Sequence, residues 1–138
     1  MYHNILDSFL QLSGVLKTLA VDLLKISNIL TKLFLNDMKS RNSGQILNVA
    51  SIAGFMPGPL MAAYYASKAY VVRLSQAIKE ELRRDKSKVS ISILCPGPVD
   101  TNFNNIARVR VSAKTLTSKY VAKYTVDKLK KKKFYINV

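Results

Sequence analysis

Three polar side chains, Ser51, Tyr64 and Lys68, have types and a spacing that suit proton transfer to or from an alcohol or a carbonyl. Tyr64 and Lys68 are four positions apart, so on a helix they lie on one face about one turn apart. A phenol has a reference pKa of about 10, and a nearby cation favours its ionised form. A serine hydroxyl can hold a substrate oxygen. The three side chains are compatible with an acid–base site, but a Tyr and a Lys at this spacing are by themselves more often part of an amphipathic helix whose lysine extends to solvent.

The segments around these residues indicate how a fold would position them. An apolar run over 46–50 predicts a short buried strand that ends at Ser51. Pro57 and Pro59 exclude a helix between Ile52 and Ala63, so we expect a loop there. A strand end, a loop and a helix start can bring the three polar groups together.

The rest of the chain alternates between helical and strand patterns. Strand, helix, strand favours parallel strands joined by a right-handed crossover, and we therefore expect an α/β fold with a doubly wound parallel sheet. The polar segment over 102–114 is either a mobile segment over the site or a plain linker. The expected elements are helices over 5–38, 64–86 and 116–130, the last capped by Thr117 or Ser118, and strands near 45–50, 89–95 and 134–138.

Three motifs follow one another in the order and at the separations of a known family. They are Asn48–Gly54, Tyr64–Ala69 and Cys95–Thr101, and together they resemble the short-chain dehydrogenase/reductase family. The resemblance is close from Leu30 to Thr101 and looser from Leu116 to Val138. It implies a Rossmann-like sheet and an NAD(P)-dependent oxidoreductase that interconverts an alcohol and a carbonyl.

The resemblance also implies roles for individual residues. Ser51 would orient the substrate, Tyr64 would be the acid/base, and Lys68 would ease proton loss from the phenol and hold the nicotinamide ribose. The loop of Pro96, Gly97 and Pro98, together with Thr101, would contact the nicotinamide end of NAD or NADP. The predicted catalytic residues are thus Ser51, Tyr64 and Lys68, and the predicted cofactor contacts are Tyr64, Lys68, Pro96, Gly97, Pro98 and Thr101.

The sequence departs from the family pattern in its first half. A dinucleotide site on this fold needs a Gly-rich turn after the first strand, and none of the glycines Gly14, Gly44, Gly54, Gly58 and Gly97 forms one. The family's relay asparagine aligns with Leu23, so no residue here is assigned that role. We therefore expect a single truncated Rossmann-like domain over 1–138, with three recognisable strands.

Charge and cysteine content restrict the class of protein. The formal net charge is +14, and from Arg108 onward ten basic residues face one acid, Asp127. A basic tail admits a polyanion-binding module, but a solvated face is the favoured explanation and no nucleic-acid motif accompanies the tail. One cysteine, Cys95, suits a reducing compartment, and the single histidine, His3, gives no metal-ligand cluster. The chain shows no signal peptide and no long apolar run, so we expect a cytoplasmic protein without a membrane span.

Two functions of different classes follow from these patterns. The first is the oxidoreductase, with a small-molecule alcohol or carbonyl substrate and NAD or NADP. The alternative is a catalytically inactive fragment that acts through association, with a basic polyanion-binding module as a weaker third hypothesis. In all cases the apolar stripes predict a homo-oligomer formed through helices near 20–38 and 65–84.

Overall fold

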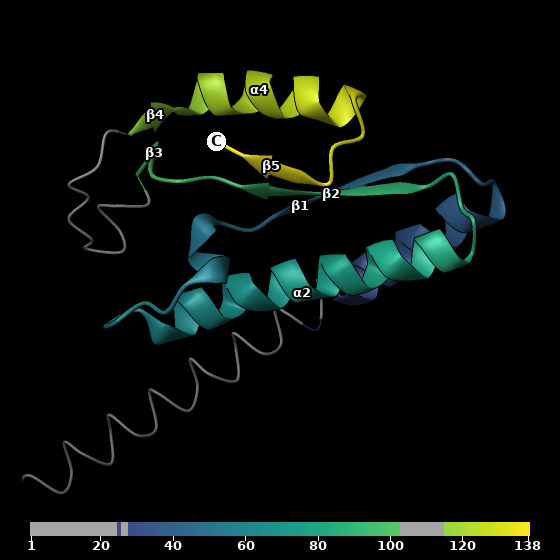
Figure 1. Ribbon diagram of the computed structural model, residues 1–138, viewed down its shortest axis with the longest axis horizontal. Helices are drawn as coiled ribbons and strands as arrows, with labels where there is room; N and C mark the ends of the chain where they lie inside the picture. The colour runs from purple at the N-terminus through teal and green to yellow at the C-terminus, as the bar shows by residue number, and fades with distance from the viewer. Residues whose placement is uncertain (1–24, 26–27, 103–114) are drawn as a thin grey trace, which may run out of the picture.

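The chain folds into three layers, with a parallel sheet between helices on either side (Figure 1). The computed structural model describes residues 25, 28–102 and 115–138. The sheet contains β1 (Gln45–Val49), β2 (Ser90–Cys95) and β5 (Tyr135–Asn137), in the order β1-β2-β5, and both pairings are parallel. The predicted α/β fold with a parallel sheet is therefore confirmed.

The central strand β2 forms because its residues can be buried on both faces. Residues 91–95 are all buried, and Ile93 and Cys95 are completely inaccessible to solvent. Such β-branched and apolar runs are typical of strands that have helices on both sides. The register pairs Ile93 with Asn48 on one side and with Tyr135 on the other, so β2 fixes the positions of both neighbouring strands.

Among the described residues, two helices cover one face of the sheet. The helix over residues 28–40 and α2 (Ala62–Arg84) lie side by side below the strands in Figure 1. Leu35 of the first helix and Ile78 of α2 pack with Ile91 of β2 in one buried cluster. The buried residues of α2 recur at three- and four-residue spacing, as expected for an apolar stripe: Val72, Ser75, Ile78 and Leu82.

One helix, α4 (Ser118–Lys130), covers the opposite face. The Thr117 side chain accepts a hydrogen bond of 3.3 Å from the Tyr120 amide, which confirms the predicted cap. Val121 packs with Leu94 and Ile136 to form the core on this side.

Several short elements differ from the sequence-based expectation. The predicted loop after Ser51 begins with a 3-10 helix, η1 (Ile52–Phe55), and α2 starts at Ala62 rather than Tyr64. The strands β3 (Val99–Asp100) and β4 (Leu116–Thr117) form a second, two-stranded parallel sheet. Of the segments predicted to be a helix over 5–38 and a polar connection over 102–114, most residues lie outside the described part of the chain.

All three described helices that lead into a strand of the main sheet end at a residue with a left-handed backbone. These residues are Asn42, Lys86 and Lys132, with φ of 49°, 50° and 51°. Amides beyond the helix ends bond back to the last turn, as Ser87 does to the Leu82 carbonyl at 3.0 Å. The three turns lie at one end of the molecule, on the right in Figure 1, where the strands begin. We call this end the amino edge of the sheet and the opposite end the carboxyl edge.

In the part of the chain that the structure describes, none of the helices combines the length and the apolarity that crossing a bilayer requires.

Candidate active site

The candidate site lies at the carboxyl edge, where all three strands of the main sheet end. Ser51 follows β1, Pro96 follows β2, and Val138 follows β5. The Ile52 amide donates to the Pro96 carbonyl at 3.1 Å, and the Gly97 amide donates to the Val138 carbonyl at 3.0 Å. Because these bonds continue the sheet pairing past the strand ends, they hold the loops after β1, β2 and β5 against one another.

Ser51 is buried and has two contacts with the backbone. Its hydroxyl oxygen accepts from the Ala53 amide at 3.1 Å, so it caps the start of η1. The same hydroxyl donates to the Pro96 carbonyl at 3.4 Å. The long second bond is a weak one, so a substrate oxygen can compete for this proton.

Tyr64 and Lys68 lie on one face of the first turns of α2. The Lys68 ammonium is 5.8 Å from the centroid of the Tyr64 ring. It also donates to the carbonyl of Val49, at 3.4 Å, two residues before Ser51. Lys68 therefore connects the helix face that carries the phenol to the strand end that carries the serine.

Burial changes the protonation of two groups near this edge. Desolvation lowers the pKa of the half-buried Lys68 ammonium. Burial likewise raises the pKa of the Cys95 thiol at the end of β2, which makes this free cysteine a buried structural residue rather than a nucleophile.

Tyr65, the neighbouring tyrosine, has a different environment from Tyr64. The two rings meet edge to face, with centroids 5.9 Å apart. A Cβ added at Gly58 would lie 2.1 Å from the Tyr65 ring, so this ring packs directly on the glycine. Tyr65 is thus held by the loop before α2, whereas the Tyr64 ring faces Lys68.

Gly54 has a role at this site that its sequence context did not predict. A Cβ at this position would lie 2.9 Å from the Lys68 carbonyl and 2.9 Å from the Val72 side chain. Only glycine therefore lets η1 approach α2 as closely as it does. The two small residues Ala53 and Gly54, which follow Ser51 and Ile52, were the available signal.

A second contact that the sequence did not indicate ties β1 to α2. The Asn48 amide group donates to the Ser75 hydroxyl at 2.7 Å, and that hydroxyl donates to the Val71 carbonyl at 2.8 Å. Ser75 is completely inaccessible to solvent. This buried chain of hydrogen bonds fixes the helix along the strand that ends at Ser51.

The loop after β2 meets part of the requirement for a dinucleotide. Gly97 is held by Val138, and the Pro98 carbonyl accepts from Leu116 at 3.1 Å, so the loop is anchored on two sides. Lys68 has three N–H donors and uses one on Val49, which leaves donors suited to ribose hydroxyls. The residues present thus fit the nicotinamide-ribose end of the cofactor. Thr101, also predicted to contact it, is exposed just beyond β3.

The described residues offer neither a metal site nor a residue at the relay position. Among residues 25, 28–102 and 115–138, no group of three His, Cys, Asp or Glu side chains could hold a metal ion. Leu23, the position aligned with the relay asparagine, lies outside the described residues. Asn28, more than a turn later, donates to the Tyr70 hydroxyl at 3.3 Å.

Two curated proteins, both reductases or dehydrogenases by name, are similar in sequence to this chain. 17-beta-hydroxysteroid dehydrogenase type 3 from Homo sapiens is 38% identical over 86 residues, covering 62% of this chain and 27% of that protein. Ketoacyl reductase HetN from Nostoc is 38% identical over 107 residues, covering 75% of this chain and 36% of that protein. The chain therefore spans about a third or less of the length of these curated relatives.

Solved structures share the fold. A short-chain dehydrogenase/reductase from Burkholderia phymatum in complex with NAD has a TM-score of 0.67 and 29% identity, covering 77% of this chain and 47% of the other. A short-chain dehydrogenase from Sphingobium yanoikuyae in complex with NADPH has a TM-score of 0.66 at 20% identity, covering 74% and 40%. A model of the short chain dehydrogenase family matches residues 10–110. From its motifs, its fold and this match, the chain belongs to the short-chain dehydrogenase/reductase family.

Proposed function

We propose that this chain supplies the catalytic half of an NAD(P)-dependent oxidoreductase that interconverts a ketone and an alcohol. The observation that carries the proposal is the position of Lys68. Its ammonium faces the Tyr64 ring at 5.8 Å and is bonded to the Val49 carbonyl beside Ser51. Tyr64 and Lys68 belong to α2, and Ser51 follows β1. The Lys68 side chain links the two elements through its bond to Val49.

Each of the three side chains has a distinct role in the proposed reaction. Tyr64 donates its phenolic proton to the carbonyl oxygen during reduction and takes a proton back during oxidation. The Ser51 hydroxyl donates a hydrogen bond to the same oxygen and so orients it. Lys68 stabilises negative charge on the phenolic oxygen after proton transfer. The nicotinamide, when bound, supplies the hydride.

We further propose that the substrate is a ketone on an apolar body. The loop that follows Ser51 exposes large apolar side chains beside the site, and such side chains can cover an apolar substrate. They are Ile52, Phe55, Met56 and Leu60. The names of the relatives, a hydroxysteroid dehydrogenase and a ketoacyl reductase, agree with this class of substrate.

The test of function uses a chain extended at its N-terminus by a Gly-rich first half. With an apolar ketone and NADH or NADPH, this protein should consume the reduced cofactor. Tyr64→Phe should lower the rate by about 10²–10⁴-fold, because it removes the proton that is transferred. Tyr65→Phe is the matched control and should have a much smaller effect, since Tyr65 points about 100° away on the helix. Equal effects of the two substitutions would reject the assignment of Tyr64.

For the 138-residue chain alone we propose weak cofactor binding and no measurable hydride transfer. The described residues include no Gly-rich turn that could grip the pyrophosphate, and dinucleotide affinity depends heavily on that grip. Calorimetric titration with NAD and with NADP measures this directly. Micromolar binding that resists added salt would show that the site residues suffice without the first half.

Two further expectations remain proposals. The helix over 28–40 exposes apolar side chains, with Leu33 62% and Phe34 57% accessible, and this supports self-association through that helix and α2. Sedimentation at micromolar concentration should then show a dimer or a larger species, and a clean monomer would contradict self-association.

The cytoplasmic location also stays a proposal, supported by the single, unpaired cysteine.

A further inference from the structure

A groove lies at the amino edge of the sheet, at the opposite end from Tyr64. It is a groove of about 350 Å³ between the last turns of α2, the start of β2 and the turn from α4 to β5. We call it the basic groove, because four cations line it: Lys79, Arg83, Lys132 and Lys133. They come from two segments about fifty residues apart in the chain, so this concentration of charge is a product of the fold.

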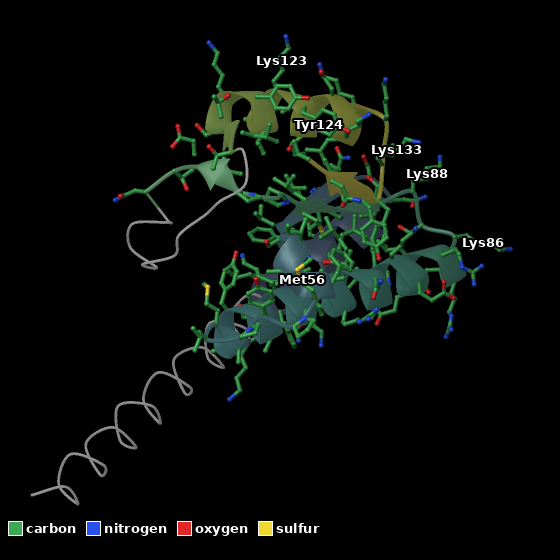
Figure 2. All side chains as sticks on the ribbon, turned by 60° about the vertical axis from the view of Figure 1, so that its left-hand side comes forward. Met56, Lys86, Lys88, Lys123, Tyr124 and Lys133 are labelled. Atoms are coloured by element: carbon green, nitrogen blue, oxygen red, sulfur yellow. The ribbon has the colours of Figure 1, made fainter. Side chains whose placement is uncertain are left out.

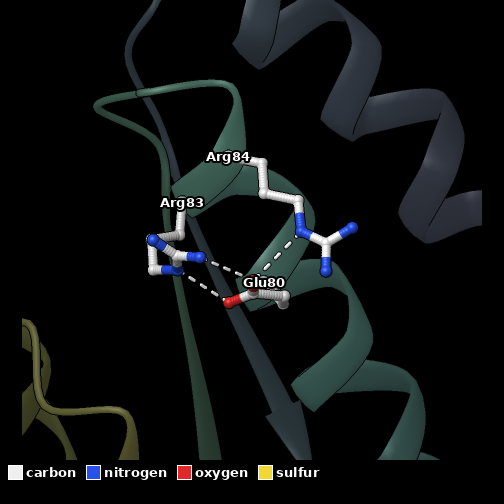
Figure 3. A network of polar contacts seen from close by, with 3 residues as sticks. All are labelled: Glu80, Arg83 and Arg84. Atoms are coloured by element: carbon white, nitrogen blue, oxygen red, sulfur yellow. Dashed lines mark hydrogen bonds and ion pairs between the residues drawn. The ribbon is translucent and has the colours of Figure 1, made fainter.

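The cations of the basic groove differ in how their charge is balanced. Arg83 bonds to both carboxylate oxygens of Glu80, each at 2.8 Å, and this pair satisfies much of its charge (Figure 3). Within the described part of the chain, Lys79, Lys132 and Lys133 have no carboxylate partner. Lys79 lies 4.0 Å from the centroid of the Phe134 ring, a contact that fixes its ammonium at the groove.

Beside its cations, the basic groove is lined by Ser90 and by apolar side chains. The Ser90 hydroxyl oxygen is shielded from solvent without a hydrogen-bond partner among the described residues. The Ser92 hydroxyl, two residues farther along β2, is unpaired in the same way. Because a shielded hydroxyl cannot contact a ligand in the groove, the Ser90 side chain is not assigned to the site. The partly buried Phe134 adds apolar surface, whereas Leu82 and Val89 belong to the buried core beneath the groove.

We propose that the basic groove binds a phosphate monoester carried on an apolar or aromatic body. Several converging ammonium groups suit a dianion, and lysine is a common phosphate ligand. The volume exceeds that of a bare phosphate and lies at the lower end of the range for small-molecule sites. The partly exposed Phe134 ring is an apolar surface for the rest of such a ligand. This site is separate from the proposed active site and does not depend on that proposal.

A structural role for the lysines gives a different expectation. Lys132 and Lys133 follow the end of α4, where cations stabilise the helix dipole. Diffuse attraction by a chain of net charge +14 would also collect phosphates. A dipole role changes stability but not binding, and diffuse attraction depends on total charge and not on position.

The experiment titrates the full chain with phenyl phosphate and follows binding by calorimetry at physiological ionic strength. We expect saturable binding of phenyl phosphate, binding of inorganic phosphate at least about tenfold weaker, and none of benzyl alcohol. Lys132→Gln with Lys133→Gln should weaken phenyl phosphate binding about tenfold or more. Vesicles with and without phosphatidate then distinguish a lipid headgroup from a free phosphate ester as the source.

The matched control is Lys119→Gln with Lys123→Gln, which removes the same charge from exposed positions of α4 outside the groove. This control should leave the affinity unchanged within about twofold. An equal loss in the control would mean diffuse attraction and would overturn the proposal. Absence of saturable phenyl phosphate binding, or equal affinity for inorganic phosphate, would overturn it as well.

Discussion

The two edges of the sheet use charge in opposite ways. At the carboxyl edge Lys68 is half-buried, its pKa is lowered by desolvation, and its ammonium contacts a carbonyl and a phenol ring. At the amino edge the lysines are numerous and solvated; Figure 2 labels Lys86, Lys88 and Lys133 there, at the ends of long exposed side chains. A single cation in a defined position suits chemistry, whereas a group of exposed cations suits attraction of an anion.

The difference follows from the direction of the helices. In a strand–helix–strand unit the helix N-terminus lies near the end of the first strand and its C-terminus near the start of the next. The carboxyl edge therefore receives the start of α2 with Tyr64, while the amino edge receives the ends of α2 and α4. Because cations near helix C-termini are favourable, lysines there stabilise the fold and also create a positive surface.

The largest effect that we expect on stability concerns the close approach of η1 and α2 at the carboxyl edge. Gly54→Ala should destabilise the protein by about 1–3 kcal/mol, because the new Cβ meets the Lys68 carbonyl of a packed helix. Urea unfolding measures the change. The matched control is Gly97→Ala, whose Cβ would find its nearest atom at 3.5 Å, and it should change stability by no more than about 0.5 kcal/mol. Equal losses of stability in the two variants would show that the close packing of η1 on α2 does not stabilise the carboxyl edge.

The second prediction tests the left-handed helix ends at the amino edge. At Lys86, where φ is 50°, glycine avoids the steric cost of a Cβ. Lys86→Gly should therefore be more stable than Lys86→Ala by about 1 kcal/mol, although both variants lose the same charge. Thermal unfolding of the pair measures this. A Lys86→Ala variant that is more stable than Lys86→Gly would contradict a left-handed backbone at Lys86.

The third prediction uses the lowered pKa of Lys68. The unfolded chain has a lysine pKa of about 10.4, so between the lower folded pKa and that value the unfolded state binds more protons. The free energy of unfolding therefore rises with pH between these two pKa values. At pH values below the folded pKa, the cost of burying the ammonium is fully present. Relative to Lys68→Met, the wild-type chain should gain stability as the pH increases toward about 10. A difference that does not change with pH would show that Lys68 is not desolvated in solution.

The smallest effect is expected from Glu80, at the amino edge. Hydrogen bonds from Arg83 and then Arg84 lower the pKa of this carboxyl to about 2. Their stabilisation is present above the usual carboxyl pKa and is lost as the pH falls through about 2. Glu80→Gln should lower stability slightly near neutral pH, because exposed pairs contribute little. Glu81→Gln, at an exposed site without an ion pair in the described chain, is the control and should have no such effect.

The sequence predicted those parts of the fold that depend on local pattern. Runs of apolar and β-branched residues predicted the three strands of the main sheet, and the spacing of Tyr64 and Lys68 predicted their shared helix face. The start of α2 was misplaced because Met61 begins the helix without a side-chain cap. The strands β3 and β4 are two residues each and form only because distant segments meet, so no local pattern marks them.

The contacts around the candidate site were harder to predict, because they join residues far apart in the chain. Gly54 looked like an ordinary loop glycine until its distance to Lys68 was known. Asn48 and Ser75 carry no signal that they bond to each other. In the same way, the tail lysines became a groove only when the fold placed Lys132 and Lys133 beside Arg83.

The strand order β1-β2-β5 is also the order of synthesis. As the chain leaves the ribosome, each strand of this sheet can add to the edge of the one before it, and no strand has to insert between two others. Ser51 and Tyr64 both emerge before β2, yet the loop that holds Ser51 bonds to Pro96 beyond that strand. The geometry of the candidate site therefore cannot form until β2 has been made, so β2 is the step of co-translational folding at which this site first takes shape.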